Sequence, residues 1–141
     1  MQIREENKIK KEYLRKYRNL QRKAKELQME IEAIESRYTG QAVTYSDMPK
    51  APQSTGDLSD MAAKVDELLT YLAQIQTATI EAYTNISYSI EQLDNETEQL
   101  VLRLRYLAGL HWNDIATELH YAERTIYKIH GDALLHFKPI A

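Results

Sequence analysis

An unbroken alternation of four-residue and three-residue steps joins the apolar side chains between residues 13 and 38. The positions are Tyr13, Tyr17, Leu20, Ala24, Leu27, Ile31, Ile34 and Tyr38. Such a heptad pattern predicts a long helix with one narrow apolar seam. Most of the remaining circumference is polar, so the seam needs a partner helix to cover it. The chain is therefore predicted to contain a coiled coil.

A second seam of the same kind begins after residue 57. Asp57 is a suitable N-cap, and the four-three spacing then continues through residues 58 to 94. Its first members are Leu58, Met61, Val65, Leu68, Leu72 and Ile75. Residues 39–57 gather Gly, Pro, Ser and Thr and predict a linker loop, with the first helix ending near Thr39 and Gly40. The two long helices are expected to pair, either as an antiparallel hairpin within one chain or between chains.

Charge is distributed unevenly along the 141 residues. Residues 1–25 carry ten Lys and Arg against three Glu, whereas residues 58–94 carry six Asp and Glu against one Lys. The basic run predicts either a solvated helix face paired with the acidic helix or a nucleic-acid patch. Because the net charge of the whole chain is −3, a uniformly basic nucleic-acid binder is excluded, and any DNA contact must depend on local charge.

Composition favours an all-α protein outside a membrane. Four Gly and three Pro occur beside many Leu, Ile, Ala, Glu, Lys and Gln. No apolar run approaches the roughly 18 residues of a membrane span, and the start MQIREENKIKKEY lacks the apolar stretch of a secretory signal. With no cysteine in the chain, disulfides and thiolate metal sites are excluded. A cytoplasmic location and no membrane partner are expected.

Residues 95–141 predict a separate domain of three short helices. Asn95 and Glu98 fit a capping box, in which each side chain bonds the backbone of the other. Helices are predicted over 96–107, 112–119 and 122 to about 136, with Gly109 closing the first of them.

The last two of these helices have the spacing of a helix-turn-helix. Two short helices that cross closely need Ala at the crossing, and Ala116 occupies that position between apolar neighbours. The predicted interior consists of Ile115, Ala116, Leu119, Tyr121, Ile126 and Ile129. If Ile126 and Ile129 point inward, the helical period turns a different set of side chains outward. The predicted DNA-binding residues are Glu123, Arg124, Thr125, Tyr127, Lys128 and His130, with Arg103 and Arg105 as candidates for contact with the DNA backbone.

The C-terminal third resembles the fourth region of bacterial sigma factors. The matching residues are Arg105-Tyr106, Gly109, Trp112-Asn113-Asp114-Ile115-Ala116 and Arg124-Thr125-Ile126-Tyr127. The whole chain, including the stretch Tyr45-Ser46-Asp47-Met48-Pro49-Lys50, resembles small phage and prophage proteins related to the late-operon regulators ArpU and RinA. This resemblance implies an activator of phage late genes in the cytoplasm of a bacterial host.

Three residues depart from that pattern. His111 and Ala122 stand where a Ser or Thr usually caps a helix, and each lost cap would cost about 1 kcal/mol. His120 stands where the turn often has Gly, which predicts a left-handed residue there. A module with these features is expected to bind DNA as a homo-oligomer assembled through the long helices.

The resulting prediction is an all-α, sequence-specific binder of double-stranded DNA that reads the major groove with residues 122–135. Two alternatives share the same motifs: a small terminase-like DNA-packaging subunit, and a sigma-like factor that contacts RNA polymerase. The four histidines lie on different elements without companion ligands, so no metal or cofactor is expected. No nucleophile-base pair or phosphate-binding glycine loop appears, so the chain is not expected to be an enzyme.

Overall fold

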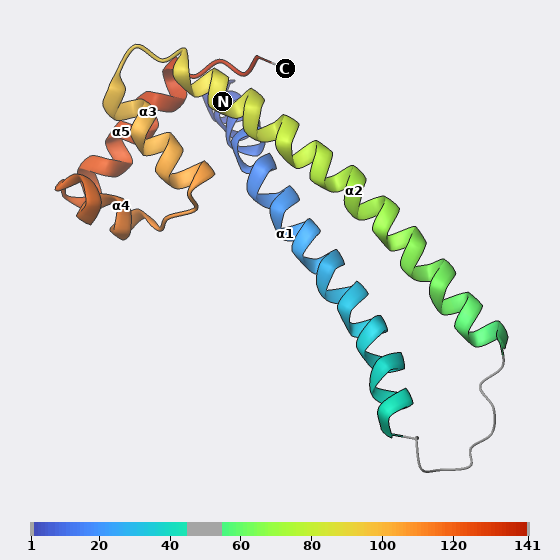
Figure 1. Ribbon diagram of the computed structural model, residues 1–141. Coiled ribbons are helices and arrows are strands. Elements are labelled where there is room, and N and C mark those ends of the chain that lie inside the picture. The colour runs from blue at the N-terminus through green and yellow to red at the C-terminus, as the bar shows by residue number, and fades with distance from the viewer. Residues whose placement is uncertain (1, 45–54, 141) are drawn as a thin grey trace. The chain divides into compact units, whose positions relative to one another are not determined.

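The computed structural model describes residues 2–44 and 55–140, and the regular structure of these residues is entirely helical (Figure 1). The elements in chain order are α1 (Gln2–Thr44), α2 (Thr55–Glu91), α3 (Glu96–Leu102), the π-helical turn η1 (Arg103–Leu107), α4 (Trp112–Leu119) and α5 (Glu123–His136). The predicted all-α architecture, two long helices followed by short C-terminal helices, is confirmed. No helix in the described part of the chain is long and apolar enough to cross a membrane.

Both ends of the predicted linker need correction. α1 continues through Gly40 to Thr44, and α2 begins at Thr55, before the expected cap at Asp57. A glycine inside a helix costs only about 1 kcal/mol relative to Ala, so Gly40 permits a helix end without imposing one. Residues 45–54, which include most of the predicted loop, lie outside the described residues.

The chain forms two compact units. One, called here the hairpin unit, consists of Gln21–Thr77. The other, called here the terminal unit, consists of Met1–Leu20 together with Ala78–Ala141. The predicted segments 1–38 and 58–94 are thus each divided between the two units.

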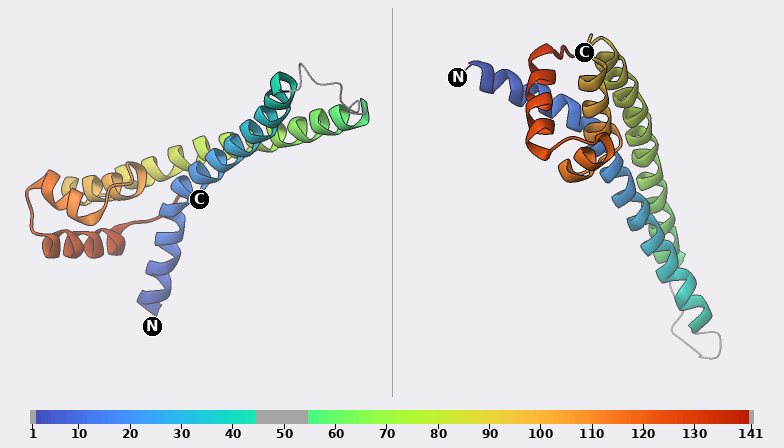
Figure 2. Two further views of the ribbon diagram at one scale, coloured as in Figure 1. Left: turned by 90° about the horizontal axis from the view of Figure 1, so that it is seen from below. Right: turned by 90° about the vertical axis from the view of Figure 1, so that its left-hand side faces the viewer.

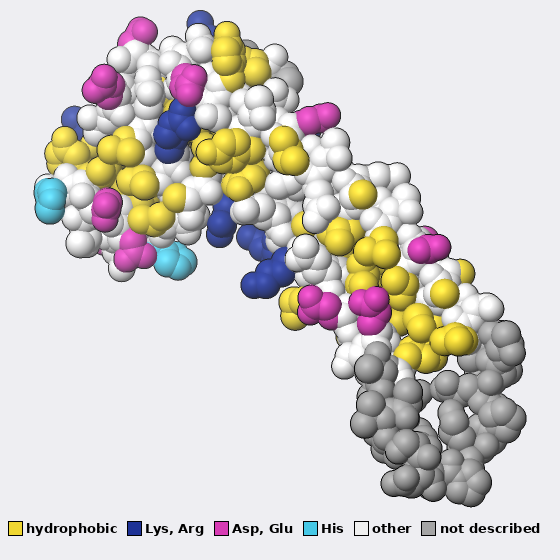
Figure 3. Space-filling view, viewed as in Figure 1, with side chains coloured by type: hydrophobic (Ala, Val, Ile, Leu, Met, Phe, Trp, Pro, Cys, Tyr) yellow, Lys and Arg dark blue, Asp and Glu magenta, His cyan; other side chains and the backbone are white. Residues whose placement is uncertain are grey.

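The hairpin unit is held together by the two heptad seams. Its buried residues are Leu27, Ile31, Val65, Leu68 and Leu72, with Ala24, Ile34, Met61 and Ile75 packed against them. Lys23 Nζ also lies 5.9 Å from the centre of the Tyr71 ring, within cation–π range. Leu58, predicted as the first seam residue of α2, is 54% exposed. Further hydrophobic side chains remain at the surface along the long helices (Figure 3), because two helices cover only one face of each other.

The core of the terminal unit contains residues from both ends of the chain. Its buried members are Leu14, Ala82, Ile86, Ile90, Leu93, Leu102, Tyr106, Ala133, Leu134 and Phe137. Leu14, which the seam pattern passed over, is fully buried, whereas its neighbour Tyr13 is half-buried. The Tyr13 ring packs 5.9 Å from Phe137, and Lys10 Nζ donates a 2.6 Å hydrogen bond to the carbonyl of Leu134. Residues 10–14 of α1 therefore pack against the C-terminal end of α5 and the residue that follows it, while the first turns of α1 extend away from α5 (Figure 2, left).

The predicted capping box at the start of α3 is half correct. Asn95 Oδ1 accepts a 3.0 Å hydrogen bond from the backbone N–H of Glu98. The Glu98 carboxylate does not complete the box, because it lies 2.9 Å from Nδ1 of His136 at the end of α5. Glu98 is buried and thereby joins the first and last helices of the C-terminal domain.

Candidate nucleic-acid interface

The apolar cluster between α3, α4 and α5 brings together most of the predicted helix-turn-helix interior. Val101, Ile115, Ala116 and Ile126 are buried in it, and Leu104, Leu110, Trp112, Leu119 and Ile129 pack against them. Ala116 is 7% exposed, which agrees with the prediction of a small side chain in the interior between the helices.

The turn between α4 and α5 is tight and left-handed. His120 has φ 61° and ψ 40°, the conformation expected at that position. The N–H of Tyr121 donates a 3.0 Å hydrogen bond to the carbonyl of Ala116 and so closes the end of α4. The prediction that Tyr121 belongs to the interior is wrong, since its side chain is 45% exposed. Only the backbone N–H of Tyr121 contributes to the turn. The change of chain direction at His120 leaves the Tyr121 ring at the surface.

Neither α4 nor α5 has a side-chain cap at its N-terminus. His111 and Ala122 occupy the N-cap positions with extended backbone angles, and neither makes a side-chain hydrogen bond to its helix. Their carbonyls accept the first helical hydrogen bonds, from Ile115 and Ile126. The two short helices therefore depend on packing for their stability.

An aromatic cluster connects η1, α4 and α5. The Trp112 ring contacts His130 at 4.7 Å and Tyr127 at 5.2 Å between centroids. The Tyr106 hydroxyl lies 2.7 Å from Nε2 of His130. Nearby, the Arg105 guanidinium lies 4.4 Å from the centre of the Trp112 ring. This cluster fixes the position of α5 relative to the two preceding elements.

His130 is part of this interior, so its predicted role in DNA contact is wrong. Its side chain is buried, and the loss of solvation lowers the pKa of His130 to about 4, with further lowering by Lys11, Arg105 and Arg15. The helical period placed His130 at the margin of the outward face, and only the positions of Tyr106 and Trp112 show that the margin is covered.

The outward face of α5 holds the other predicted DNA-binding residues. Glu123, Arg124, Tyr127 and Lys128 are exposed, and Thr125 is half-buried. The Tyr127 hydroxyl donates a 3.3 Å hydrogen bond to Glu123 Oε1. Among the described residues, neither Arg124 nor Lys128 has an ion-pair partner. Both cations are thus available to an external anion.

Arg103 and Arg105 both make contacts within the protein, and their predicted contact with the DNA backbone stays a prediction. Arg103 donates to Ser87 Oγ at 3.0 Å and pairs with Glu91 at 3.1 Å. Arg105 donates to the carbonyl of Leu110 at 3.1 Å in addition to its contact with Trp112. These two side chains connect η1 to α2 and to the start of α4.

The π-helical turn at η1 was not predicted from the sequence. The N–H of Ala108 donates to the carbonyl of Arg103 at 2.9 Å, which spans one residue more than an α-helical bond. Gly109 follows with φ 77°, and the Arg18 guanidinium occupies the space where a Cβ of residue 109 would lie. Gly109 therefore meets both requirements, a positive φ and the absence of a side chain.

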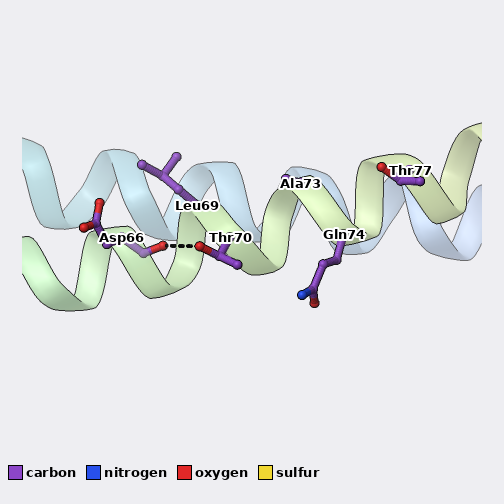
Figure 4. A pocket seen from close by; sticks show the side chains of 6 residues that line it. All are labelled: Asp66, Leu69, Thr70, Ala73, Gln74 and Thr77. Atoms are coloured by element: carbon purple, nitrogen blue, oxygen red, sulfur yellow. Dashed lines mark hydrogen bonds between the residues drawn. The ribbon is translucent and has the colours of Figure 1, made fainter.

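A shallow groove lies on α2, and all the residues that line it come from this one helix (Figure 4). Asp66, Leu69, Thr70, Ala73, Gln74 and Thr77 line it. The Thr70 hydroxyl donates 3.0 Å back to the carbonyl of Asp66 and so does not point at a ligand. In the part of the chain that the structure describes, no group of three His, Asp or Glu side chains is arranged to hold a metal ion.

Comparison of the chain with models of protein families, with curated proteins and with solved structures finds no match. The functional interpretation therefore depends on the geometry of this structure.

Proposed function

We propose that the protein binds double-stranded DNA sequence-specifically, with α5 as the recognition helix of a helix-turn-helix. The observation that carries the proposal is the division of α5 into two faces. Ile126 and Ile129 hold one face on α4, while Arg124 and Lys128 are exposed on the other and have no ion-pair partner within the described ranges 2–44 and 55–140.

The geometry of the turn supports this proposal. A left-handed residue directly after an eight-residue helix, with a small side chain at the crossing, leaves one face of the first half of the next helix exposed. An exposed helix of this kind fits the major groove, which is about 12 Å wide. Arg and Lys are the side chains that most often contact guanine edges there. Glu123 fits as well, since a carboxylate accepts from the amino group of cytosine.

We also propose that the protein activates the transcription of phage late genes. This part of the proposal is based on the resemblance to phage late regulators. The exposed apolar side chains of the long helices, such as Leu69 at 47% exposure, provide a surface through which two copies can associate. A pair of recognition helices would read two half-sites and compensate for the weak affinity of one small module.

A selection of bound sequences from a random double-stranded DNA pool tests this function. We expect the recovered sequences to share one motif, repeated with two-fold symmetry if the protein binds as a dimer. Recovery of no motif, with binding no stronger than nonspecific binding, would refute the assignment of α5.

A further inference from the structure

Four basic side chains lie along one face of the first turns of α1. Arg4, Lys8, Lys11 and Arg15 are separated by four, three and four residues, which places them in one row on a helix. We call this row the α1 basic stripe. At 1.5 Å per residue it is about 16 Å long.

The surface around the stripe is strongly positive. Its four cations line a common hollow together with Asn7 and Glu12. Glu12 is the only acidic side chain in that lining, so the lining carries a net charge of +3. Like charges at a spacing of four residues destabilise a helix, and a bound polyanion would relieve this repulsion.

The cations of the stripe are available for binding. Arg4, Lys8 and Arg15 are exposed and Lys11 is half-buried. None of the four has an ion-pair partner among the described residues. In this they resemble Arg124 and Lys128 on α5 and differ from Arg103, which pairs with Glu91.

The stripe is also fixed in position relative to α5. Leu14 is fully buried in the core of the terminal unit, with Ala133 and Leu134 of α5 in the same cluster. The bond from Lys10 to the Leu134 carbonyl adds a polar contact between the two helices. Residues 10–14 of α1 therefore cannot swing away from α5 without opening this core.

A hydrogen bond connects the stripe's part of α1 to the helix that carries His130. Lys10, the neighbour of Lys11, donates to the carbonyl of Leu134, about one helical turn after His130. The charges of Lys11 and Arg15 also help to lower the pKa of His130. Trp112 touches both His130 and Tyr127 of that helix, and Tyr127 is a residue of the outward face.

We propose that the α1 basic stripe is a second DNA contact, which binds the phosphate backbone next to the groove that α5 enters. This inference rests on the proposed function of α5. Duplex DNA carries one negative charge per roughly 1.7 Å of its axis, so a stripe of this length faces several phosphates. Such contacts position a protein on DNA and add affinity without reading sequence.

The test compares variants on the DNA motif recovered by the selection described above, labelled for fluorescence anisotropy over a series of salt concentrations. K8A/K11A/R15A is expected to weaken binding about tenfold or more. The slope of log affinity against log salt should fall by about 2 to 3, at about 0.9 per lost phosphate contact. The selected motif should stay the same, because no base contact is lost.

Two controls accompany this variant. K25A/R37A/K64A also removes two Lys and one Arg, from exposed positions in the hairpin unit, and should bind like the unchanged protein. K8R/K11R/R15K keeps every charge and should keep the salt slope. Helicity by circular dichroism shows that each variant is folded.

The possible failures are distinguishable. If the unchanged protein selects a motif and K8A/K11A/R15A binds it with the same affinity and salt slope, the stripe is not a DNA contact, and the proposed function stands. An equal loss in K25A/R37A/K64A would assign the effect to total charge and also refute the inference. If the unchanged protein binds no duplex DNA, both proposals fail.

Discussion

The hydroxyl of Tyr106 and Nε2 of His130 lie 2.7 Å apart, and the two rings stack with their centres separated by 5.7 Å. Burial and the nearby cations keep His130 neutral down to a pKa of about 4. An ordinary histidine in the unfolded chain has a pKa of about 6.5. The difference connects protonation of this one side chain to the stability of the terminal unit.

Stability should therefore fall as the pH is lowered from about 6.5 to about 4. In that window the unfolded chain binds a proton at residue 130 that the folded protein does not, and the loss can reach about 3 kcal/mol. Thermal unfolding measured across this range checks the prediction. H130Q keeps a hydrogen-bond partner for Tyr106 but does not titrate, so the stability of this variant should depend less on pH. If H130Q and the unchanged protein lost stability equally between these pH values, protonation of His130 would not be the cause.

The pair formed by His136 and Glu98 has the opposite pH dependence. The hydrogen bond to Glu98, and then the charge of Glu98, raise the pKa of His136. The stabilisation is thus present below the unfolded pKa of about 6.5 and is lost as the pH rises through the raised value. E98Q should lower the melting temperature more at about pH 5.5 than at about pH 9, and H136Q should show the same trend. An equal loss at both pH values would refute a role for the charge of His136.

R124A/K128A should abolish sequence-specific binding while leaving the fold intact. Each lost base contact of this kind costs about 1 to 3 kcal/mol, so the loss of two should lower the affinity for the selected site at least about thirtyfold. K25A/R37A removes the same two residue types from exposed positions on α1 and provides the matched control. Anisotropy on the selected duplex measures the change, and an unchanged affinity would remove α5 from the recognition role.

A116E should unfold the domain built by α3, α4 and α5. Ala116 is buried where the helices cross, and an uncompensated buried charge costs about 3 to 5 kcal/mol, which is a large part of the stability of a small domain. A63E places the same charge on the exposed surface of α2 and should have little effect. Circular dichroism and thermal melting distinguish the two; a normally folded A116E would refute the packing at the crossing.

Gly109 and Gly131 should respond in opposite directions to replacement by alanine. G109A places a Cβ at a positive φ, against the Arg18 guanidinium, and should destabilise the protein by about 1 to 3 kcal/mol. In α5, a Cβ on residue 131 would meet no atom within 4 Å, so G131A should stabilise the helix by about 0.5 to 1 kcal/mol. Chemical denaturation gives both values. Since the end of the Arg18 side chain can move aside, the cost is expected from the positive φ, and a neutral G109A would contradict that strain.

Periodicity predicted the helices of this protein well because a heptad seam reports directly which face is covered. Val65, Leu68 and Leu72 were placed correctly for this reason. Periodicity did not predict burial correctly where a side chain is covered by a segment distant in the sequence. The pattern selected Tyr13 and passed over Leu14, which is buried in a core that also includes residues of α3, α5 and Phe137.

In the candidate site, too, the helical period predicted some positions correctly and could not predict others. A helical wheel of α5 separates Ile126 from Arg124 correctly, since those two residues lie on opposite faces. It cannot show whether a residue at the boundary is covered, and so His130 was assigned to the wrong side. Tyr121 was misplaced because apolar character in a turn does not reveal which way the side chain points. The α1 basic stripe is visible in the sequence as charge, but the packing of α1 on α5, through Lys10 and Leu14, depends on contacts between distant segments.

The joint contribution of α1, α2 and α5 to one core limits how this protein can be divided. A fragment beginning at Asn95 would retain every residue of α5, yet it would lose Leu14, Ile86 and Ile90 from around Leu102 and Phe137. Exposure of these side chains would favour aggregation of the isolated fragment. The C-terminal third of this chain is therefore not expected to fold alone, and a chimera that receives α5 from another protein would need long helices that match it.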